Sequence, residues 1–127
     1  MASIQLVRLP GDLAEPLSRV LQSQGHRFVV TNSVESAARP SDAKILFVGG
    51  DGPDYRAVVQ ELTLRRRDAA VIVVNRLPEN SRWLDALELG AADYCGAPFE
   101  AIQVNWLIEG ALRGLAMKAG RVAKAAA

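Results

Sequence analysis

The stretch Val71–Phe99, VIVVNRLPENSRWLDALELGAADYCGAPF, decides the fold of this chain. It opens with Val71–Val74, a β-branched run that is apolar on both faces and too short for a helix, which is typical of a central strand in a parallel sheet. Trp83–Leu89 then has apolar residues at helical spacing, and Gly90 ends the helix because glycine readily adopts the left-handed conformation found there. Ala91–Cys95 indicates another short strand. The stretch therefore predicts a strand, a helix and a second strand.

The rest of the chain repeats this alternation of short apolar runs and helical patterns. The residues that mark the start of the helix described above are Pro78, Asn80 and Ser81. The other predicted strands are Ile4–Leu9, Phe28–Val30 and Ile45–Val48, and the other predicted helices are Asp12 to Gly25, Ser33–Ala38, Asp54 to Arg66 and Ala101–Leu115. Five strand–helix units predict an α/β fold: a flavodoxin-like, five-stranded parallel sheet of order 2-1-3-4-5 with helices on both faces.

Several polar residues have structural roles in this interpretation. Asp12 is expected to be an N-cap. The triplet Arg65–Arg67 lies at a helix C-terminus, where positive charge interacts favourably with the helix dipole. His26 follows a helix end on the edge opposite the strand ends, so we expect a surface or capping role. Cys95, inside a predicted strand, is expected to be a small core residue.

Length and composition limit the classes of protein that fit. The chain has 127 residues, one cysteine and a formal net charge of +1, and half of its residues are hydrophobic. This charge gives no electrostatic reason to expect nucleic acid or an anionic membrane as partner. The sequence has no apolar run of about 20 residues and no signal-peptide pattern, and one cysteine can form neither an intramolecular disulfide nor a thiolate metal site. We therefore expect a cytoplasmic protein.

The end of the opening stretch, GAADYCGAPF, resembles the end of a bacterial response-regulator receiver domain. In that family a Gly-Ala pair ends the helix before the fifth strand, the strand carries an aromatic residue, and Lys-Pro-Phe follows. The residues that fit are Gly90, Ala91, Tyr94, Pro98 and Phe99. The resemblance implies a receiver-like domain over residues 1–116 with the same strand order and a cis peptide bond at Ala97-Pro98. The tail over 117–127 is small and basic in composition, so we expect either a helical extension or disorder there.

The resemblance also implies where a phosphorylation site would lie. Receiver domains place an acidic pair that holds Mg²⁺ after the first strand, an acceptor aspartate at the end of the third, a Ser or Thr at the end of the fourth, and a lysine before the proline. The residues at those positions here are Arg8, Leu9, Gly49, Asn75 and Ala97. None supplies the required group, so we expect a pseudo-receiver that is not an enzyme and uses no metal or cofactor.

Two alternatives remain open from the sequence. Asp51 lies two residues beyond the acceptor position, so a functional receiver with atypical phosphorylation at Asp51 is one. The other is a flavodoxin-like domain that binds a small ligand or an anion through the glycine-rich loop Gly49–Gly52, with Arg8 and Arg76 as the anion contacts. That loop has neither the dinucleotide-binding spacing nor the lysine of a Walker loop.

Large apolar residues indicate a contact face. Trp83 and Leu84 are adjacent on one helix, so they cannot both face the core, and the resemblance to receiver domains implies that Leu84 points inward and Trp83 outward. On the last helix, Ile102 and Trp106 are expected to form a second apolar stripe beside the inward one, which comprises Val104, Ile108, Ala111 and Leu112. Tyr94 lies on the strand between these helices. The alternative is that Trp106 only widens the core face.

The sequence thus favours a phosphorylation-independent signalling domain of two-component type that acts through protein–protein interaction. The candidate interaction face comprises Trp83, Tyr94, Ile102 and Trp106, in the fourth helix, fifth strand and fifth helix. Its partner is expected to be another protein or a second copy of the chain, since tryptophan and tyrosine are enriched at interface hot spots.

Overall fold

The computed structural model describes residues 2–76 and 80–126, and these alternate between strands and helices along the chain. The strands are β1 (Ser3–Val7), β2 (Arg27–Thr31), β3 (Ile45–Gly49), β4 (Ala70–Asn75) and β5 (Asp93–Gly96), and the helices are α1 (Gly11–Ser23), α2 (Val34–Ala38), α3 (Tyr55–Arg65), α4 (Asn80–Glu88) and α5 (Ala101–Ala126). Every predicted element is present, with ends shifted by a few residues except in α5, which extends further than predicted. Pro78, predicted to help start the fourth helix, lies outside the described residues.

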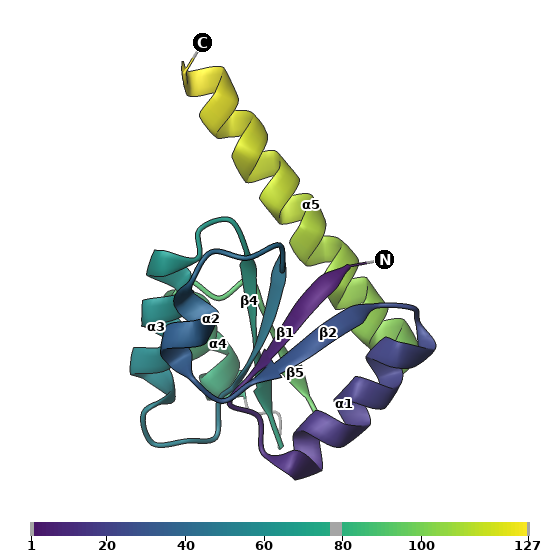
Figure 1. The fold of residues 1–127 in the computed structure, drawn as a ribbon. Helices are drawn as coiled ribbons and strands as arrows, with labels where there is room; N and C mark the ends of the chain where they lie inside the picture. The colour runs from purple at the N-terminus through teal and green to yellow at the C-terminus, as the bar shows by residue number, and fades with distance from the viewer. Residues whose placement is uncertain (1, 77–79, 127) are drawn as a thin grey trace.

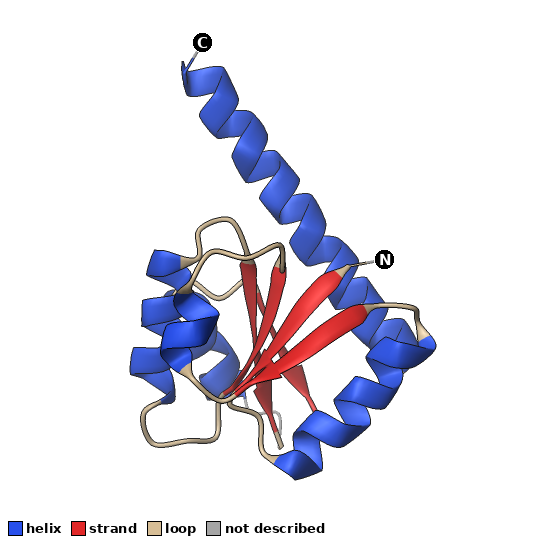
Figure 2. Ribbon diagram, in the orientation of Figure 1, coloured by secondary structure: helices blue, strands red, loops and turns tan. Residues whose placement is uncertain are grey.

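The five strands form one parallel sheet in the order β2-β1-β3-β4-β5, which confirms the prediction. Figure 1 shows α1 and α5 on one face of this sheet and α2, α3 and α4 on the other. The three layers, with the sheet in the middle, are evident when the elements are coloured by type (Figure 2). All strands run in one direction, so their carboxyl ends lie together at one edge of the sheet.

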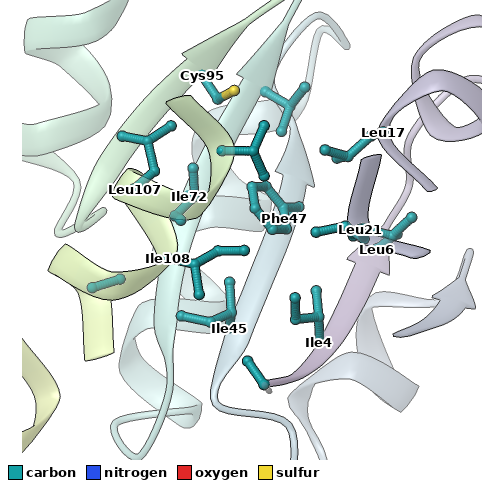
Figure 3. Close-up of a cluster of buried hydrophobic side chains, with 14 of the residues drawn as sticks. Ile4, Leu6, Leu17, Leu21, Ile45, Phe47, Ile72, Cys95, Leu107 and Ile108 are labelled. Atoms are coloured by element: carbon teal, nitrogen blue, oxygen red, sulfur yellow. The ribbon is translucent and has the colours of Figure 1, made fainter. Parts of the chain in front are cut away.

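The core consists of two hydrophobic layers, one on each face of the sheet. Alternate side chains of β3 divide between them: Phe47 packs under α1 and α5, and Leu46 packs under the other three helices. Figure 3 shows the first layer, in which Phe47 and Ile72 from the central strands meet Leu17 of α1 and Ile108 of α5. Because β3 and β4 are buried on both faces, their continuous apolar runs were predictable as strands from the sequence.

The helix starts only partly follow the predictions. Ser33 caps α2 with its hydroxyl, which accepts a hydrogen bond from the Ser36 backbone N–H at 3.2 Å. The prediction that Asp12 is an N-cap is wrong, because α1 begins at Gly11 with Pro10 at the cap position. Asp12 lies instead in the first turn, where its carboxylate is free to bind a distant residue.

The predicted arginine triplet lies at the C-terminus of α3, with Arg65 in the last turn and Arg66 at the C-cap position. Arg66 is buried, and its guanidinium donates to the carbonyl oxygens of Ala37 at 3.0 Å and Ala43 at 2.7 Å and to the carboxylate of Asp68 at 3.1 Å. These contacts link the end of α2, the segment before β3 and the turn before β4. Arg66 therefore lies at the C-cap position of α3, where its backbone N–H donates to the Leu62 carbonyl oxygen, and its buried side chain is also an internal cross-link.

His26 joins the start of the chain to α5. Its Nδ1 accepts a hydrogen bond from the Ala2 backbone N–H at 3.0 Å, and its Nε2 lies 2.9 Å from Oδ1 of Asn105. Since Nδ1 accepts, Nε2 is the nitrogen that donates. His26 therefore has a structural role at the corner between α1 and β2, far from the carboxyl ends of the strands.

The last helix is longer than predicted. It continues to Ala126, across the predicted boundary at residue 116, and its final turns extend beyond the rest of the domain (Figure 1). Among the helices in the described ranges, this one included, none is long and apolar enough to span a membrane.

Candidate functional site

The carboxyl edge of the sheet brings together all five positions at which receiver domains have catalytic groups. Arg8 follows β1, and its carbonyl oxygen lies against Gly49 at the end of β3. Leu9 is buried beside the same glycine. The Ala97 backbone N–H donates to the Asn75 carbonyl oxygen at 3.1 Å. We call this region the strand-end edge; the five residues lie at the predicted positions, and their side chains differ from those that receiver domains have there.

Gly49, at the predicted acceptor position, has no room for a side chain. A Cβ atom placed on it would lie 2.5 Å from the carbonyl oxygen of Arg8, closer than non-bonded atoms approach. Arg8 has a φ of 53°, an unusual conformation for a residue with a side chain. The main chain after β1 therefore occupies the space into which an acceptor aspartate would extend.

The second glycine of the loop is packed in the same way. A Cβ on Gly50 would lie 2.5 Å from Cγ1 of Val73 and 2.6 Å from Oδ1 of Asn75. The Gly50 backbone N–H donates to the carbonyl oxygen of Val74 at 2.9 Å. Glycine at positions 49 and 50 thus permits close packing against β1 and β4, which accounts for these two residues without a bound anion.

Asp51 is held by β4 and the residue after it. One carboxylate oxygen accepts from Nδ2 of Asn75 at 2.9 Å, and the other accepts from the Arg76 backbone N–H at 3.1 Å. The Arg76 guanidinium lies 3.6 Å from the same carboxylate. Asn75 is buried, and its Oδ1 has no hydrogen-bond partner among the described residues. Both oxygens of Asp51 therefore already have donors.

Arg76 also binds α1. Its guanidinium forms a bidentate pair with the carboxylate of Asp12, at 2.7 and 2.8 Å, and so bridges Asp12 and Asp51. The hydrogen bonds from Arg76 hold the pKa of the Asp12 carboxyl below its ordinary value, because they stabilise its charged form. Arg8 forms a single hydrogen-bonded ion pair with Asp54, at 2.8 Å.

The residues at the strand-end edge do not fit the Mg²⁺ that the resemblance implies. A divalent ion needs carboxylate oxygens that are not already neutralised. Here the nearby carboxylates of Asp12, Asp51 and Asp54 each face a guanidinium. Within residues 2–76 and 80–126 no group of three potential metal-ligating side chains is present. The ion pairs at the strand-end edge therefore occupy the carboxylates that would otherwise bind a divalent ion.

These ion pairs were missed at the level of sequence, although a signal was present. Asp12 and Arg76 are 64 positions apart, so local patterns do not connect them. Both nevertheless come shortly after predicted strands, and parallel strands bring such positions to one edge. Residues of opposite charge that follow two strands of the same parallel sheet therefore indicate, in the sequence alone, an ion pair at that edge.

The turn after β5 has the predicted geometry. The Ala97-Pro98 peptide bond is cis, and Phe99 packs against the hydrophobic layer under α1 and α5. Cys95 is buried in that layer, which confirms the core role predicted for it. Burial raises the pKa of its thiol to about 12, with a smaller contribution from the charge of Asp93, so the thiol is unreactive near neutral pH.

The candidate interaction face carries large exposed apolar side chains. The exposed fractions are 43% for Trp83, 86% for Ile102 and 65% for Trp106. Tyr94 is half-buried and packs against the layer under α4. Trp106 therefore does not widen the core, since most of its surface is exposed to solvent.

Ile102 and Trp106 lie on the outer face of α5. The buried residues of α5 are Val104, Leu107, Ile108 and Ala111. Trp106 is two positions from both Val104 and Ile108, and at 3.6 residues per turn this places it on nearly the opposite side of the helix. The expected second stripe beside the core face is thus wrong in position, and Leu107 was missed as a core residue.

The expectation that Leu84 points inward is also wrong. Leu84 is 56% exposed, and Ala86 is the buried residue of α4 in the described part of that helix. The rotation of α4 is fixed by Asp85, whose carboxylate accepts hydrogen bonds from Tyr55 and Arg56 of α3. Since Asp85 faces α3, Leu84 beside it faces solvent and enlarges the apolar surface of α4.

Comparisons with known proteins identify the fold. No protein-family model matches the sequence, and no curated protein matches it. Solved structures do match. NtrX from Brucella abortus superposes with a TM-score of 0.80 at 20% identity over 95% of this chain, which spans 29% of the NtrX chain.

Two single-domain structures match over nearly their whole length. A response regulator receiver domain protein from Clostridium thermocellum has a TM-score of 0.77 at 14% identity, and covers 92% of this chain and 98% of its own. A CheY-like receiver domain protein from Methanospirillum hungatei has a TM-score of 0.76 at 13% identity, over 93% and 98%. The chain therefore has the receiver-domain fold.

Proposed function

We propose that this chain is a receiver-like signalling domain of two-component type that does not use phosphorylation and acts through contact with another protein chain. The observation that carries the proposal is the lack of space at Gly49, where the Arg8 carbonyl oxygen occupies the position of an acceptor side chain. A domain with this fold and no space for an acceptor at the strand-end edge can still signal by binding another protein chain through its other surfaces.

The ion pairs support this proposal against phosphorylation at Asp51. Its carboxylate would have to act as nucleophile toward a phosphodonor while a metal offset the charge. Both of its oxygens instead accept hydrogen bonds, and Arg76 bridges it to Asp12. Phosphorylation would require these pairs to open and a cation to replace Arg76.

The close packing of Gly49 and Gly50 argues against the alternative of an anion-binding loop. An anion site needs backbone N–H groups and cations that are free to bind. The Gly50 N–H donates to Val74, and the guanidiniums of Arg8 and Arg76 bind carboxylates. No specific observation on the described residues favours the anion-binding alternative.

The interaction face supports a protein partner. Trp83, Ile102 and Trp106 expose large apolar surfaces on α4 and α5, and exposed surfaces of this kind are typical of contact sites. Glu109 and Arg113, also exposed on α5, provide charges of both signs. A surface with both signs suits a self-complementary contact between two copies.

Sedimentation equilibrium of the wild-type chain and of Trp106→Ala tests this proposal. We expect the wild type to self-associate and Trp106→Ala to weaken association by about 2 kcal/mol, the cost of removing an interface hot spot. Addition of a small phosphodonor with Mg²⁺ should not change the association.

The control is urea unfolding of the same two proteins. An exposed tryptophan should change the free energy of unfolding little, whereas a core tryptophan would cost about 3–5 kcal/mol. If Trp106→Ala unfolds the domain, or if association is unchanged by the substitution, the interaction face is misassigned. Association that depends on the phosphodonor would instead support a functional receiver.

A further inference from the structure

A groove runs along α5 at the edge of the sheet opposite the strand-end edge. One part is a cavity of about 460 Å³ between α5 and the first residues of β4 and β5. A second, more open part of about 780 Å³ continues along α5 toward Lys44. The two parts share Arg67, Leu115 and Lys118 as lining residues, which lie at the boundary between them. We call the two parts together the α5 groove.

Two glycines keep the first part of the groove open. Gly110 and Gly114 are four positions apart, on one face of α5, and both line the cavity. A Cβ on Gly114 would have no atom within 4 Å, and one on Gly110 would be in ordinary contact with Arg113. Glycine is among the least favourable residues within a helix, and no packing requirement explains it at position 114.

Positive charge borders the groove. Arg67 and Lys118 form no hydrogen bond or ion pair with any residue in the described part of the chain. Lys44 lies 3.8 Å from Asp68, whose carboxylate is bound by the buried Arg66. The guanidinium of Arg66 holds the pKa of Asp68 low and offsets its charge. Arg67 and Lys118 are therefore the border cations that have no carboxylate partner among the described residues, whereas Lys44 shares Asp68 with Arg66.

The walls of the groove are largely apolar. Leu112, Leu115, Ala116 and Ala119 line the more open part, at the spacing of one helix face. Asp93, the remaining acid of the lining, accepts a hydrogen bond from the Tyr94 backbone N–H at 2.8 Å. The combination is an apolar trough of the size of small-molecule sites with unpaired cations at its border.

We propose that the α5 groove binds a small amphipathic organic anion, a molecule with an apolar body and one acidic group. The body would lie in the first part, against Ala111 and Leu115, where Gly110 and Gly114 leave space. The acidic group would bind Arg67 and Lys118. A second copy of the chain suits the groove poorly, because the end of its α5 is basic, with Lys118 and, by sequence, Arg121. The inference is independent of the proposed function.

Titration with 1-anilinonaphthalene-8-sulfonate, an amphipathic anion whose fluorescence rises in apolar sites, tests this inference. We expect saturable binding of one dye per chain and displacement of the dye by laurate. Arg67→Ala combined with Lys118→Ala should weaken binding about tenfold or more, since a charged contact is lost at each position. Trp106→Ala, which alters the exposed apolar surface of α5 outside the groove, should leave the titration unchanged.

The sharpest comparison is Gly114→Leu against Gly120→Leu. Both substitutions replace a helical glycine whose Cβ would meet nothing within 4 Å, so both should raise the melting temperature. Position 114 lines the groove and position 120 does not. We expect Gly114→Leu to abolish dye binding and Gly120→Leu to preserve it.

Three results would overturn the inference. Dye binding that Gly114→Leu leaves intact would place the dye elsewhere. Dye binding lost equally in Trp106→Ala would assign it to the exposed tryptophan surface. The third result combines two observations: laurate does not displace the dye, and the chain sediments with anionic lipid vesicles unless Arg67 and Lys118 are replaced. The occupant of the groove would then be a membrane surface and not a free small molecule.

Discussion

Gly49 is the residue at which the strand-end edge differs most directly from a phosphorylation site. Replacing it with aspartate should not restore an acceptor, because the new Cβ would meet the Arg8 carbonyl oxygen at 2.5 Å. We expect Gly49→Asp to lower the free energy of unfolding by about 1–3 kcal/mol, the usual cost of forcing atoms into a packed site. Urea unfolding followed by circular dichroism measures this.

Gly11→Ala is the matched control for that substitution. A Cβ on Gly11 would meet nothing within 4 Å, so the control should have nearly the stability of the wild type. A Gly49→Asp variant as stable as Gly11→Ala would mean that the chain after β1 moves aside easily. The steric argument for a closed edge would then fail.

Arg66 illustrates how one buried cation can hold several loops. Arg66→Met keeps an apolar stem but leaves the carbonyl oxygens of Ala37 and Ala43 without their donor. We expect a loss of about 2–4 kcal/mol in the free energy of unfolding, from buried acceptors that lose their hydrogen bonds. The neighbouring Arg67→Met is the control.

Arg67 is exposed and unpaired within the described residues, so its replacement should change stability by about 0.5 kcal/mol or less. Chemical denaturation of the two variants side by side gives the comparison. Equal effects would show that burial and hydrogen bonding of Arg66 contribute nothing beyond its charge.

At the scale of elements, the pair between Asp12 and Arg76 joins α1 to the end of β4. The pKa of Asp12 is lowered in the folded state, so the pair stabilises the fold above the ordinary pKa of 3.8. This contribution is lost as pH falls through the lowered value. Asp12→Asn should therefore lower the melting temperature by about 2–4 °C at neutral pH and by nothing near about pH 2.

Melting curves of wild type and Asp12→Asn across this pH range measure that difference. Glu15→Gln is a suitable comparison, since Glu15 pairs with Arg19 one turn along α1 and, in the described part of the chain, with no residue of another element. A gap between wild type and Asp12→Asn that widens on acidification would contradict the sign of the pKa shift. The link between the elements would then not depend on the charged carboxylate.

Strands were more predictable than the orientation of helices. Val71–Val74 and Ile45–Val48 are apolar on both faces, and only a central parallel strand buries such a run on both sides. The orientation of α4 depended on Asp85 binding two residues of α3, a contact between distant segments. Leu84 was therefore assigned to the wrong side.

The candidate site was predictable in its positions but not in its contacts. Residues at the strand ends were placed correctly because the parallel topology dictates where the carboxyl ends meet. Whether Gly49 had room for a substitute, or Asp51 was free, depended on the conformation of Arg8 and on the side chain of Arg76. Local sequence patterns carry no information on either.

On the scale of the whole molecule, three separate surfaces bear on what the protein does. The strand-end edge is closed by Arg8, Arg76 and their carboxylates, and the outer face of α5 exposes Ile102 and Trp106. The α5 groove lies at the other edge of the sheet. A receiver fold can therefore lose the chemistry of one edge while its other surfaces remain available for binding.

The most direct test of the account is the intact mass of the chain after incubation with acetyl phosphate and Mg²⁺. A receiver domain with its acceptor aspartate, treated in parallel, confirms that the donor is active. We expect the mass of this chain to stay unchanged, because Gly49 has no space for an acceptor and both oxygens of Asp51 are bound. An added phosphoryl group that maps to Asp51 would contradict the account.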